Sequence, residues 1–343
     1  MRIAIVTDAW APQVNGVVRT LQATAALLTA RGHTVLVISP NLFRSLPCPT
    51  YPEIRLALTG RRTVGRMLDA FEPDAVHIAT EGPLGHAARR HRLAGGQPFT
   101  TAYHTQFPDY IARRTHLPAG MFWPIVTRFH EPSAGILVAT ESVRRELAAH
   151  GLTQTCEWSR GVDLADFSPD APPPPLFEAL PRPIQLYVGR VAVEKNIEAF
   201  LSAEHPGSKV VVGDGPALAH LRSAYPQAHF LGRKSGSSLA GCYAGADVFV
   251  FPSRTDTFGL VMIEAMACGT PVAAYPVTGP IDVVDQHAGA LDHDLGKAIG
   301  AALLRHGEDC IAHARRFTWE RSVTQFLHAL VPGDPLAELG RVA

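Results

Sequence analysis

The sequence predicts an α/β protein built from two Rossmann-like domains, and three observations support this fold class. Short apolar runs rich in β-branched residues alternate with stretches of helical spacing. The alternation stops at a proline-rich segment and then starts again, and 343 residues suffice for about two domains. Because the apolar runs are continuous, we expect strands buried on both faces, as in a parallel sheet covered by helices.

The expected elements follow the chain in order. Strands of the first domain are predicted at 3–7, 34–39, 75–78, 99–103 and 136–139. Seven prolines then mark residues 166–183 as a linker, because proline cannot donate to a sheet ladder or sit inside a helix. In the second domain we expect strands at 184–188, 209–212, 248–251 and 271–274 and helices at 196–203, 258–268 and 295–305. The predicted organisation is a domain over 1–165, the linker, a domain over 184–316 and a helical tail over 317–343 that packs back on a domain.

Composition excludes several classes of protein. A chain that is 46% hydrophobic and 18% charged is typical of soluble globular proteins, and no apolar run is long enough to span a membrane. The first residues run straight into a strand-like segment, so we expect no cleaved leader. The five cysteines are far apart and never spaced as CxxC, which predicts neither disulfides nor a zinc site and favours the cytoplasm.

Charge is unevenly distributed along the chain. Residues 1–165 carry 17 basic and 12 acidic side chains, whereas residues 166–343 carry 14 and 19, which gives +5 and −5. The basic half contains three arginine clusters: Arg61/Arg62/Arg66, Arg89/Arg90/Arg92 and Arg113/Arg114. They are either solvated helix faces or a surface for an anionic membrane. Nucleic acid is not expected as a partner, because the pI is near 7.3 and aromatic residues do not interleave with the arginines.

Ligands of open α/β sheets bind beyond the carboxyl ends of the strands, so the loops that follow the strands are the candidate ligand sites. After the first strand, Asn15-Gly16 allows close approach of another molecule. The chain has no GxGxxG and no GxxxxGK[ST], which disfavours dinucleotide and P-loop binding. His104 directly follows a predicted strand, at the edge expected to face the second domain. No HExxH or close His/Asp cluster is present, so no metal site is expected.

Two cations occupy the corresponding loop of the second domain, which reads GRVAVEKN over 189–196. Arg190 and Lys195 suit a diphosphate, and ion pairing with Glu194 or Glu198 is an equally good interpretation.

The next loop, VGDGP, contains two glycines. Gly213 and Gly215 indicate a tight turn with close contacts, or an ordinary helix start with Pro216 in its first turn.

The segment FPSRTDTFGLVMIEAMACGTPVAA over 251–274 is the most informative. We expect its helix to begin near Thr257 or Phe258, which leaves the first-turn amides available to an anion. Asp256 lies just before this helix, and Glu264 lies about two turns further along. The alternative is that Asp256 is the N-cap and Glu264 a solvated or core-edge acid.

Taken in this order, these motifs resemble the retaining glycosyltransferases of family 4, which have the GT-B fold. The resemblance covers nearly the whole chain and includes the loop after the first strand, YHT, GRxxxEKN, VGDGP and SRTDTFGLVMIEAMACGT. It implies two Rossmann-like domains facing across a cleft. The C-terminal domain would hold an NDP-sugar and the N-terminal domain the acceptor, with no metal and no cofactor.

The resemblance also implies a role for individual residues. Arg190 and Lys195 would bind the donor diphosphate, and Glu264 would bind the ribose hydroxyls. The implied catalytic set is His104, Arg190, Lys195 and Asp256. The implied donor-binding set is Gly16, Gly189, Arg190, Lys195, Gly213, Gly215, Thr257, Phe258, Gly259, Leu260 and Glu264. The family commonly has Glu where this chain has Asp256, although TDTFG resembles a subgroup of sulfoquinovosyl-, mannosyl- and glucosyl-type lipid glycosyltransferases.

The predicted function is therefore transfer of a hexose, with retention, from a UDP- or GDP-sugar to an acceptor hydroxyl. A membrane lipid such as diacylglycerol is the favoured acceptor, and the base is expected near residues 230–238. The alternatives are a soluble acceptor, a GT-B epimerase or phosphorylase, and an inactive GT-B partner subunit.

Overall fold

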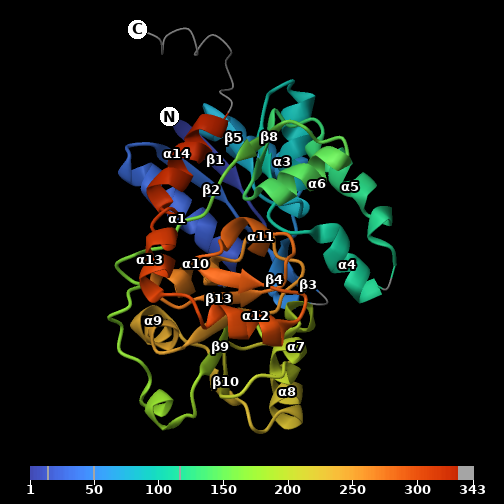
Figure 1. Ribbon diagram of the computed structural model, residues 1–343. Helices are drawn as coiled ribbons and strands as arrows, with labels where there is room; N and C mark the ends of the chain where they lie inside the picture. The colour runs from blue at the N-terminus through green and yellow to red at the C-terminus, as the bar shows by residue number, and fades with distance from the viewer. Residues whose placement is uncertain (14, 49–50, 116, 331–343) are drawn as a thin grey trace. The chain divides into compact units, whose positions relative to one another are not determined.

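The chain divides into two compact units, Met1–Ser159 with Trp319–Ala343 and Arg160–Thr318 (Figure 1). The computed structural model describes residues 1–13, 15–48, 51–115 and 117–330, with only the backbone described at 51–53, 110 and 113–115. Each unit contains its own parallel sheet, as the sequence predicts.

The sheet of the first unit has the strand order β2-β1-β5-β6-β7-β8, and all neighbouring strands are parallel. Its strands are β1 Arg2–Val6, β2 Thr34–Ile38, β5 Ala75–Ile78, β6 Thr100–Ala102, β7 Gly135–Val138 and β8 Thr155–Glu157. Ile3 and Ile5 belong to one apolar cluster, and Ala4 and Val6 to another. Successive side chains of β1 are therefore buried on opposite faces, which explains its unbroken apolar run.

Helices cover both faces of this sheet (Figure 1). They are α1 Gly16–Ala30, α2 Arg61–Phe71, α3 Pro83–Ala94, α4 Phe107–Thr115, α5 Trp123–His130, α6 Glu141–Ala149 and α14 Trp319–Ala329. A hairpin of β3 Ser45–Cys48 and β4 Tyr51–Ala57 adds a small antiparallel sheet.

The sheet of the second unit has the order β11-β10-β9-β12-β13-β14 and is also parallel throughout. Its strands are β9 Ile184–Val188, β10 Ser208–Val212, β11 His229–Gly232, β12 Val248–Phe251, β13 Val272–Ala274 and β14 Gly289–Leu291. Its helices are α7 Ile197–Ser202, α8 Leu218–Ala224, α9 Gly236–Ala244, α10 Leu260–Ala267, α11 Pro280–Val283, α12 Leu295–Ala302 and α13 Gly307–Ala314.

The unit boundary differs from the expected one, since it falls after Ser159 and places the proline-rich segment 166–183 inside the second unit. Phe177 in this segment is only 2% exposed. A Cβ on Gly241 of α9 would overlap the carbonyl oxygen of Pro172, so helix and segment are in close contact. The segment packs because it carries an apolar anchor as well as prolines.

The C-terminal helix α14 belongs to the first unit. Val323 and Phe326 are fully buried in the same cluster as Ile3, Ile5 and Leu21. Residues 331–343 of the expected tail lie outside the described residues. No helix in the described part of the chain is long and apolar enough to cross a membrane, and all five cysteines are free.

Candidate active site

Apart from Gly16, the predicted donor residues lie at the carboxyl edge of the second sheet, on the loops after three adjacent strands or in the helix α10 that follows the last of them. β9 pairs with β10 on one side and with β12 on the other. The chain proceeds outward from β9 to β11 and then returns to the other side at β12, so the strand order reverses between β9 and β12. Connections that diverge from such a switch point open a crevice in which open α/β sheets bind their ligands.

Lys195 and Asp256 meet across this switch point. The ammonium of Lys195 donates to both carboxylate oxygens of Asp256, with N–O distances of 2.6 and 2.8 Å. The two side chains are 27% and 25% exposed, so solvent still reaches the pair. Neither acidic neighbour considered from the sequence appears in this ion pair, and Glu198 lies 3.4 Å from His220 instead.

The environment of Asp256 favours its ionised form. Burial by itself would raise the pKa of this carboxyl group, but the charge and hydrogen bonds of Lys195 outweigh burial and hold the pKa below its usual value. Asn196, which follows Lys195, donates from its side chain to the carbonyl of Pro252 at 3.0 Å. The loops after β9 and β12 are therefore joined twice, which fixes the position of the charge pair.

Arg190 lies in the loop directly after β9 and is half-buried. Its carbonyl accepts a hydrogen bond from the Tyr187 hydroxyl at 2.8 Å. The neighbouring amide of Val191 donates to the carbonyl of Asp214 at 2.9 Å, which ties the loop after β9 to the loop after β10.

The predicted glycines allow these two loops to approach each other. Gly213 has a φ of 145°, and a Cβ there would overlap the carbonyl oxygen of Gly189. A Cβ on Gly215 would likewise overlap the carbonyl of Val191. The alternative of a helix start at Pro216 is wrong, because α8 begins at Leu218.

The helix after β12 begins later than the sequence predicts. Gly259 adopts a left-handed conformation with φ 86° and ψ 75°, and α10 starts at Leu260. This conformation prevents the helix from extending back to Thr257 or Phe258, which are both buried. The first-turn amides of α10 are those of Leu260 and Val261.

The same helix start excludes the N-cap role considered for Asp256. The N-cap of α10 is Gly259, and no side chain caps this helix. Asp256 is therefore free of a capping role and is held by Lys195.

Glu264 is 1% exposed in the second turn of α10. Its Oε2 accepts a hydrogen bond of 3.0 Å from the hydroxyl of Tyr243 on α9, a partner that nothing in the sequence indicated. In this conformation Glu264 is a core acid, and binding of ribose hydroxyls requires its second oxygen to be uncovered. Its contact with ribose stays a prediction.

Gly16 and His104 belong to the first unit. Gly16 is the exposed first residue of α1, and the side chain of Asn15 caps this helix by accepting from the amide of Val18 at 3.0 Å. His104 lies two residues after β6, half-buried, with its ring edge-on to Trp158 at 5.4 Å. The predicted contacts of both residues with a donor stay predictions. Among the described residues, no group of three or more His, Cys, Asp or Glu is arranged to hold a metal.

Two Rossmann-like units, with two cations and a carboxylate at the ligand edge of the second, define a two-domain protein of the nucleotide-binding α/β class. The family model "Glycosyltransferase Family 4" matches residues 14–166, and "Glycosyl transferases group 1" matches residues 182–309. A GDP-mannose-dependent alpha-mannosyltransferase of Mycobacterium tuberculosis is 32% identical, over 94% of this chain and 93% of its own. The chain belongs to glycosyltransferase family 4.

Other relatives agree with this assignment. An alpha-monoglucosyldiacylglycerol synthase of Streptococcus pneumoniae is 29% identical, over 89% of this chain and 78% of its own. The solved sucrose-phosphate synthase of Thermosynechococcus elongatus superposes with a TM-score of 0.75 at 23% identity, over 95% and 97% of the two chains. The GT-B fold and glycosyltransferase class predicted from the sequence are confirmed. The protein is an enzyme that transfers a sugar from a nucleotide-sugar to an acceptor.

Proposed function

We propose that this enzyme transfers a hexose, with retention, from a UDP- or GDP-linked donor to the hydroxyl of a membrane lipid such as diacylglycerol. The observation that supports this most directly is the Lys195–Asp256 pair beside Arg190 at the switch point of the second sheet. A relative that uses GDP-mannose and one named for a glucosylated diacylglycerol support the donor and acceptor classes.

The cations act on the leaving group. Arg190 and Lys195 bind the donor diphosphate, whose negative charge grows as the bond between the anomeric carbon and the phosphate oxygen breaks. Fixed cations at that position stabilise the transition state more than the ground state. The loops after β9 and β10 can approach the diphosphate closely because they contain Gly189, Gly213 and Gly215. The amides of Leu260 and Val261 contribute the positive end of α10.

Asp256 has two functions in this proposal. Before the donor binds, it neutralises Lys195 and keeps the ammonium directed at the crevice. When the donor binds, the ammonium of Lys195 interacts with both the diphosphate and Asp256. An oxygen of Asp256 then accepts a hydrogen bond from a sugar hydroxyl. Aspartate is one methylene shorter than glutamate, so the sugar must bind closer to the loop after β12.

Transfer then needs no base from the protein. The acceptor oxygen bonds to the anomeric carbon on the face from which the diphosphate departs, and the acceptor proton passes to the departing phosphate oxygen. We also propose that His104 contacts the sugar and that Gly16 contacts the donor. Glu264 binds the ribose, and the base lies near residues 230–238, which run from β11 into the start of α9. Because Arg190 and Lys195 neutralise the diphosphate, we expect the reaction to proceed without a metal.

A transfer assay tests this proposal. The protein is incubated with radiolabelled GDP-mannose or UDP-glucose and a membrane extract, with and without EDTA, and the organic phase is counted. We expect the same amount of label in a lipid with and without EDTA. NMR of the product should show the anomeric configuration of the donor. Label in a soluble product supports a soluble acceptor, and an altered donor sugar supports an epimerase. No reaction with any sugar nucleotide supports an inactive subunit, and an inverted product contradicts retention.

A further inference from the structure

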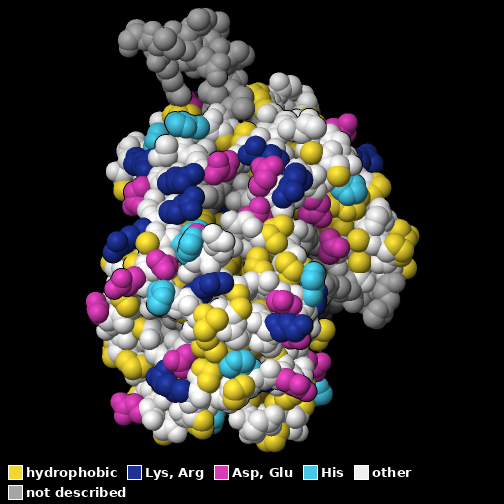
Figure 2. Space-filling model, viewed as in Figure 1, with side chains coloured by type: hydrophobic (Ala, Val, Ile, Leu, Met, Phe, Trp, Pro, Cys, Tyr) yellow, Lys and Arg dark blue, Asp and Glu magenta, His cyan; other side chains and the backbone are white. Residues whose placement is uncertain are grey.

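Tyr187 is a buried polar residue of the second unit that the proposed mechanism does not use. It lies near the end of β9, the strand between β10 and β12, just before the loop that contains Arg190. Lys and Arg side chains lie at many places on the surface shown in Figure 2, whereas Tyr187 is only 2% exposed. Tyr187 can therefore affect a bound donor only through the residues that cover it.

The ring of Tyr187 is held by the core of the second unit. It stacks on Phe200 of α7, with the ring centroids 6.5 Å apart and an angle of 27° between the ring planes. Both residues belong to one buried apolar cluster, and the backbone of Tyr187 pairs with Val211 of β10. A ring packed in this way has few alternative rotamers, so the position of its hydroxyl is fixed.

The hydroxyl of Tyr187 reaches the backbone of Arg190 across Gly189. It donates to the carbonyl of Arg190 at 2.8 Å. A Cβ on Gly189 would lie 2.8 Å from the same hydroxyl oxygen, which is closer than a side chain allows. Glycine at position 189 is therefore needed for the contact between Tyr187 and Arg190.

The peptide group after Arg190 is held on its other side as well. The amide of Val191 belongs to the same peptide group as the Arg190 carbonyl, and it donates to the carbonyl of Asp214 at 2.9 Å. Because a peptide group is planar, these two hydrogen bonds together fix its orientation. The direction in which the Arg190 side chain leaves the backbone follows from that orientation and from the strand before it.

The protonation state of Tyr187 suits a hydrogen-bond donor. Burial raises the pKa of its hydroxyl well above the ordinary value, and the negative charges of Asp256 and Glu194 raise it further. The hydroxyl therefore keeps its proton near neutral pH, and its bond to the Arg190 carbonyl is maintained.

We infer that Tyr187 is a positioning residue of the donor site, which directs the guanidinium of Arg190 at the donor diphosphate before the donor binds. This role rests on the proposed function, in which Arg190 binds that diphosphate. A cation that is already oriented loses less free energy on binding and stabilises the leaving group better. Without the hydroxyl, the peptide after Arg190 can rotate, and the guanidinium spends less time in the productive orientation.

A double-mutant cycle in the full chain tests this role. Tyr187→Phe removes the hydroxyl and keeps the ring. We expect it to weaken binding of UDP or GDP, measured by calorimetry, and to lower kcat/KM, each about five- to tenfold, which corresponds to one hydrogen bond. In the Arg190→Ala background the same change should cost less than about twofold, because no guanidinium is left to direct. Equal losses in the two backgrounds overturn the inference.

Ser208→Ala is the matched control, because it removes a buried hydroxyl–carbonyl hydrogen bond at the opposite edge of the same sheet. Ser208, the first residue of β10, is 6% exposed, and its hydroxyl donates to the carbonyl of Pro181 at 2.7 Å. We expect Ser208→Ala and Tyr187→Phe both to lower the thermal midpoint, and only Tyr187→Phe to lower nucleotide affinity. An equal loss of affinity in Ser208→Ala would reflect a general loosening of the unit and overturns the inference.

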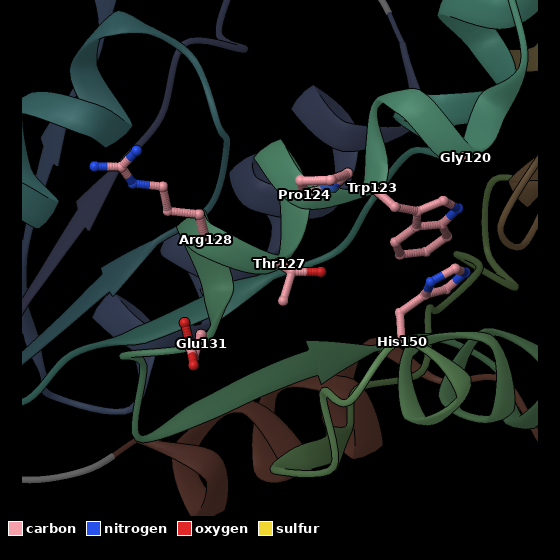
Figure 3. A pocket seen from close by; sticks show the side chains of 7 residues that line it. All are labelled: Gly120, Trp123, Pro124, Thr127, Arg128, Glu131 and His150. Carbon is pink, nitrogen blue, oxygen red and sulfur yellow. The ribbon is translucent and has the colours of Figure 1, made fainter.

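Tryptophan fluorescence checks that the effect is confined to the second unit. All four tryptophans belong to the first unit: Trp10, Trp123, Trp158 and Trp319. Figure 3 shows one of them, Trp123, stacked on His150. The emission spectrum of Tyr187→Phe should equal that of the wild type. A changed spectrum places the effect outside the donor loop and overturns the inference.

Failure of this inference and failure of the proposed function give different results. Turnover and nucleotide affinity of Tyr187→Phe equal to those of the wild type refute the positioning role alone. The expected coupled loss of UDP or GDP affinity, in an enzyme that transfers no sugar to a lipid, refutes the proposed acceptor alone. A wild-type chain that binds neither nucleotide refutes both.

Discussion

Arg190 and Lys195 lie in the same loop after β9, so the effects of removing each can be compared directly. We expect Arg190→Ala and Lys195→Ala each to lower kcat about a hundredfold or more, because each stabilises charge that develops on the leaving diphosphate. Lys195→Ala should in addition lower the thermal midpoint, since it leaves the carboxylate of Asp256 without its ammonium partner. Turnover and melting of both variants check this, and near wild-type turnover would remove these residues from the site.

Asp256 can be tested by a change that keeps its size. Asp256→Asn should lower kcat severely, because it loses charge-assisted hydrogen bonds, which are roughly twice as strong as neutral ones. The lowered pKa of Asp256 means that the ion pair stabilises the fold above about pH 4 and that this contribution is lost as pH falls through the lowered pKa. Acid titration of stability should therefore be flatter in Asp256→Asn. If Asp256→Asn is active and its stability depends on pH as in the wild type, Asp256 neither binds the sugar nor stabilises the fold through its ion pair.

The role of Glu264 can be tested with its hydrogen-bond partner Tyr243 as a control. Glu264→Gln should weaken binding of UDP or GDP tenfold or more if the carboxylate binds ribose. Tyr243→Phe removes the buried hydrogen bond to Oε2 and should cost about 1 kcal/mol of stability while changing nucleotide affinity much less. Calorimetry of both variants decides the matter, because equal losses of affinity would leave Glu264 only a packing role.

At the scale of elements, we expect the start of α10 to affect donor binding, because Gly259 fixes where the first-turn amides lie. Gly259→Ala places a Cβ in the left-handed region and 2.8 Å from Met262 Cε, so we expect a loss of about 1–3 kcal/mol and weaker donor binding as the first-turn amides shift. Gly269, at the other end of α10, also has a positive φ, but a Cβ there would meet its nearest atom at 3.6 Å. Gly269→Ala should lose stability without losing donor affinity. Unchanged donor binding in Gly259→Ala would show that these amides do not contact the donor.

The strands show what periodicity can predict. Central strands such as β5 and β9 were predicted at their observed bounds, because burial on both faces requires continuous apolar runs. The edge strands β8, β11 and β14 were missed, since TCE, HFLG and GAL are short and mixed. The β3–β4 hairpin contains Pro47 and Pro52, which argue against strands except at edges. The late start of α10 depends on the φ of Gly259, which no spacing shows.

At the scale of the molecule, the sequence predicted that Arg190, Lys195 and Asp256 lie on loops at the carboxyl edge of the second sheet, but it did not predict that Lys195 and Asp256 form a pair. Loop positions follow from the βα order, because the carboxyl ends of parallel strands share one edge. The Lys195–Asp256 contact spans 61 residues and depends on β9 and β12 being neighbours, which follows from strand order rather than sequence spacing. The Tyr243–Glu264 bond likewise requires α9 and α10 to pack together.

The way the chain is divided between the two units predicts how fragments fold. Residues 160–318 form a continuous unit that includes its own proline-rich segment. The first unit, in contrast, needs α14 from the end of the chain, because the fully buried Val323 and Phe326 complete the cluster around Ile3 and Ile5. Removing two such side chains costs on the order of 5 kcal/mol, which is comparable with the roughly 5–15 kcal/mol that stabilise a typical domain.

We therefore expect the fragment 160–318 to melt cooperatively and to bind UDP or GDP, while the fragment 1–159 lacks a cooperative transition. A peptide covering residues 319–330 should restore that transition when added to fragment 1–159, because it supplies the missing face of the core. Circular dichroism melting of the three samples, with the whole chain as reference, measures this. Cooperative melting of fragment 1–159 alone would show that the first sheet is stable without α14, and failure of 160–318 to fold would contradict its independence.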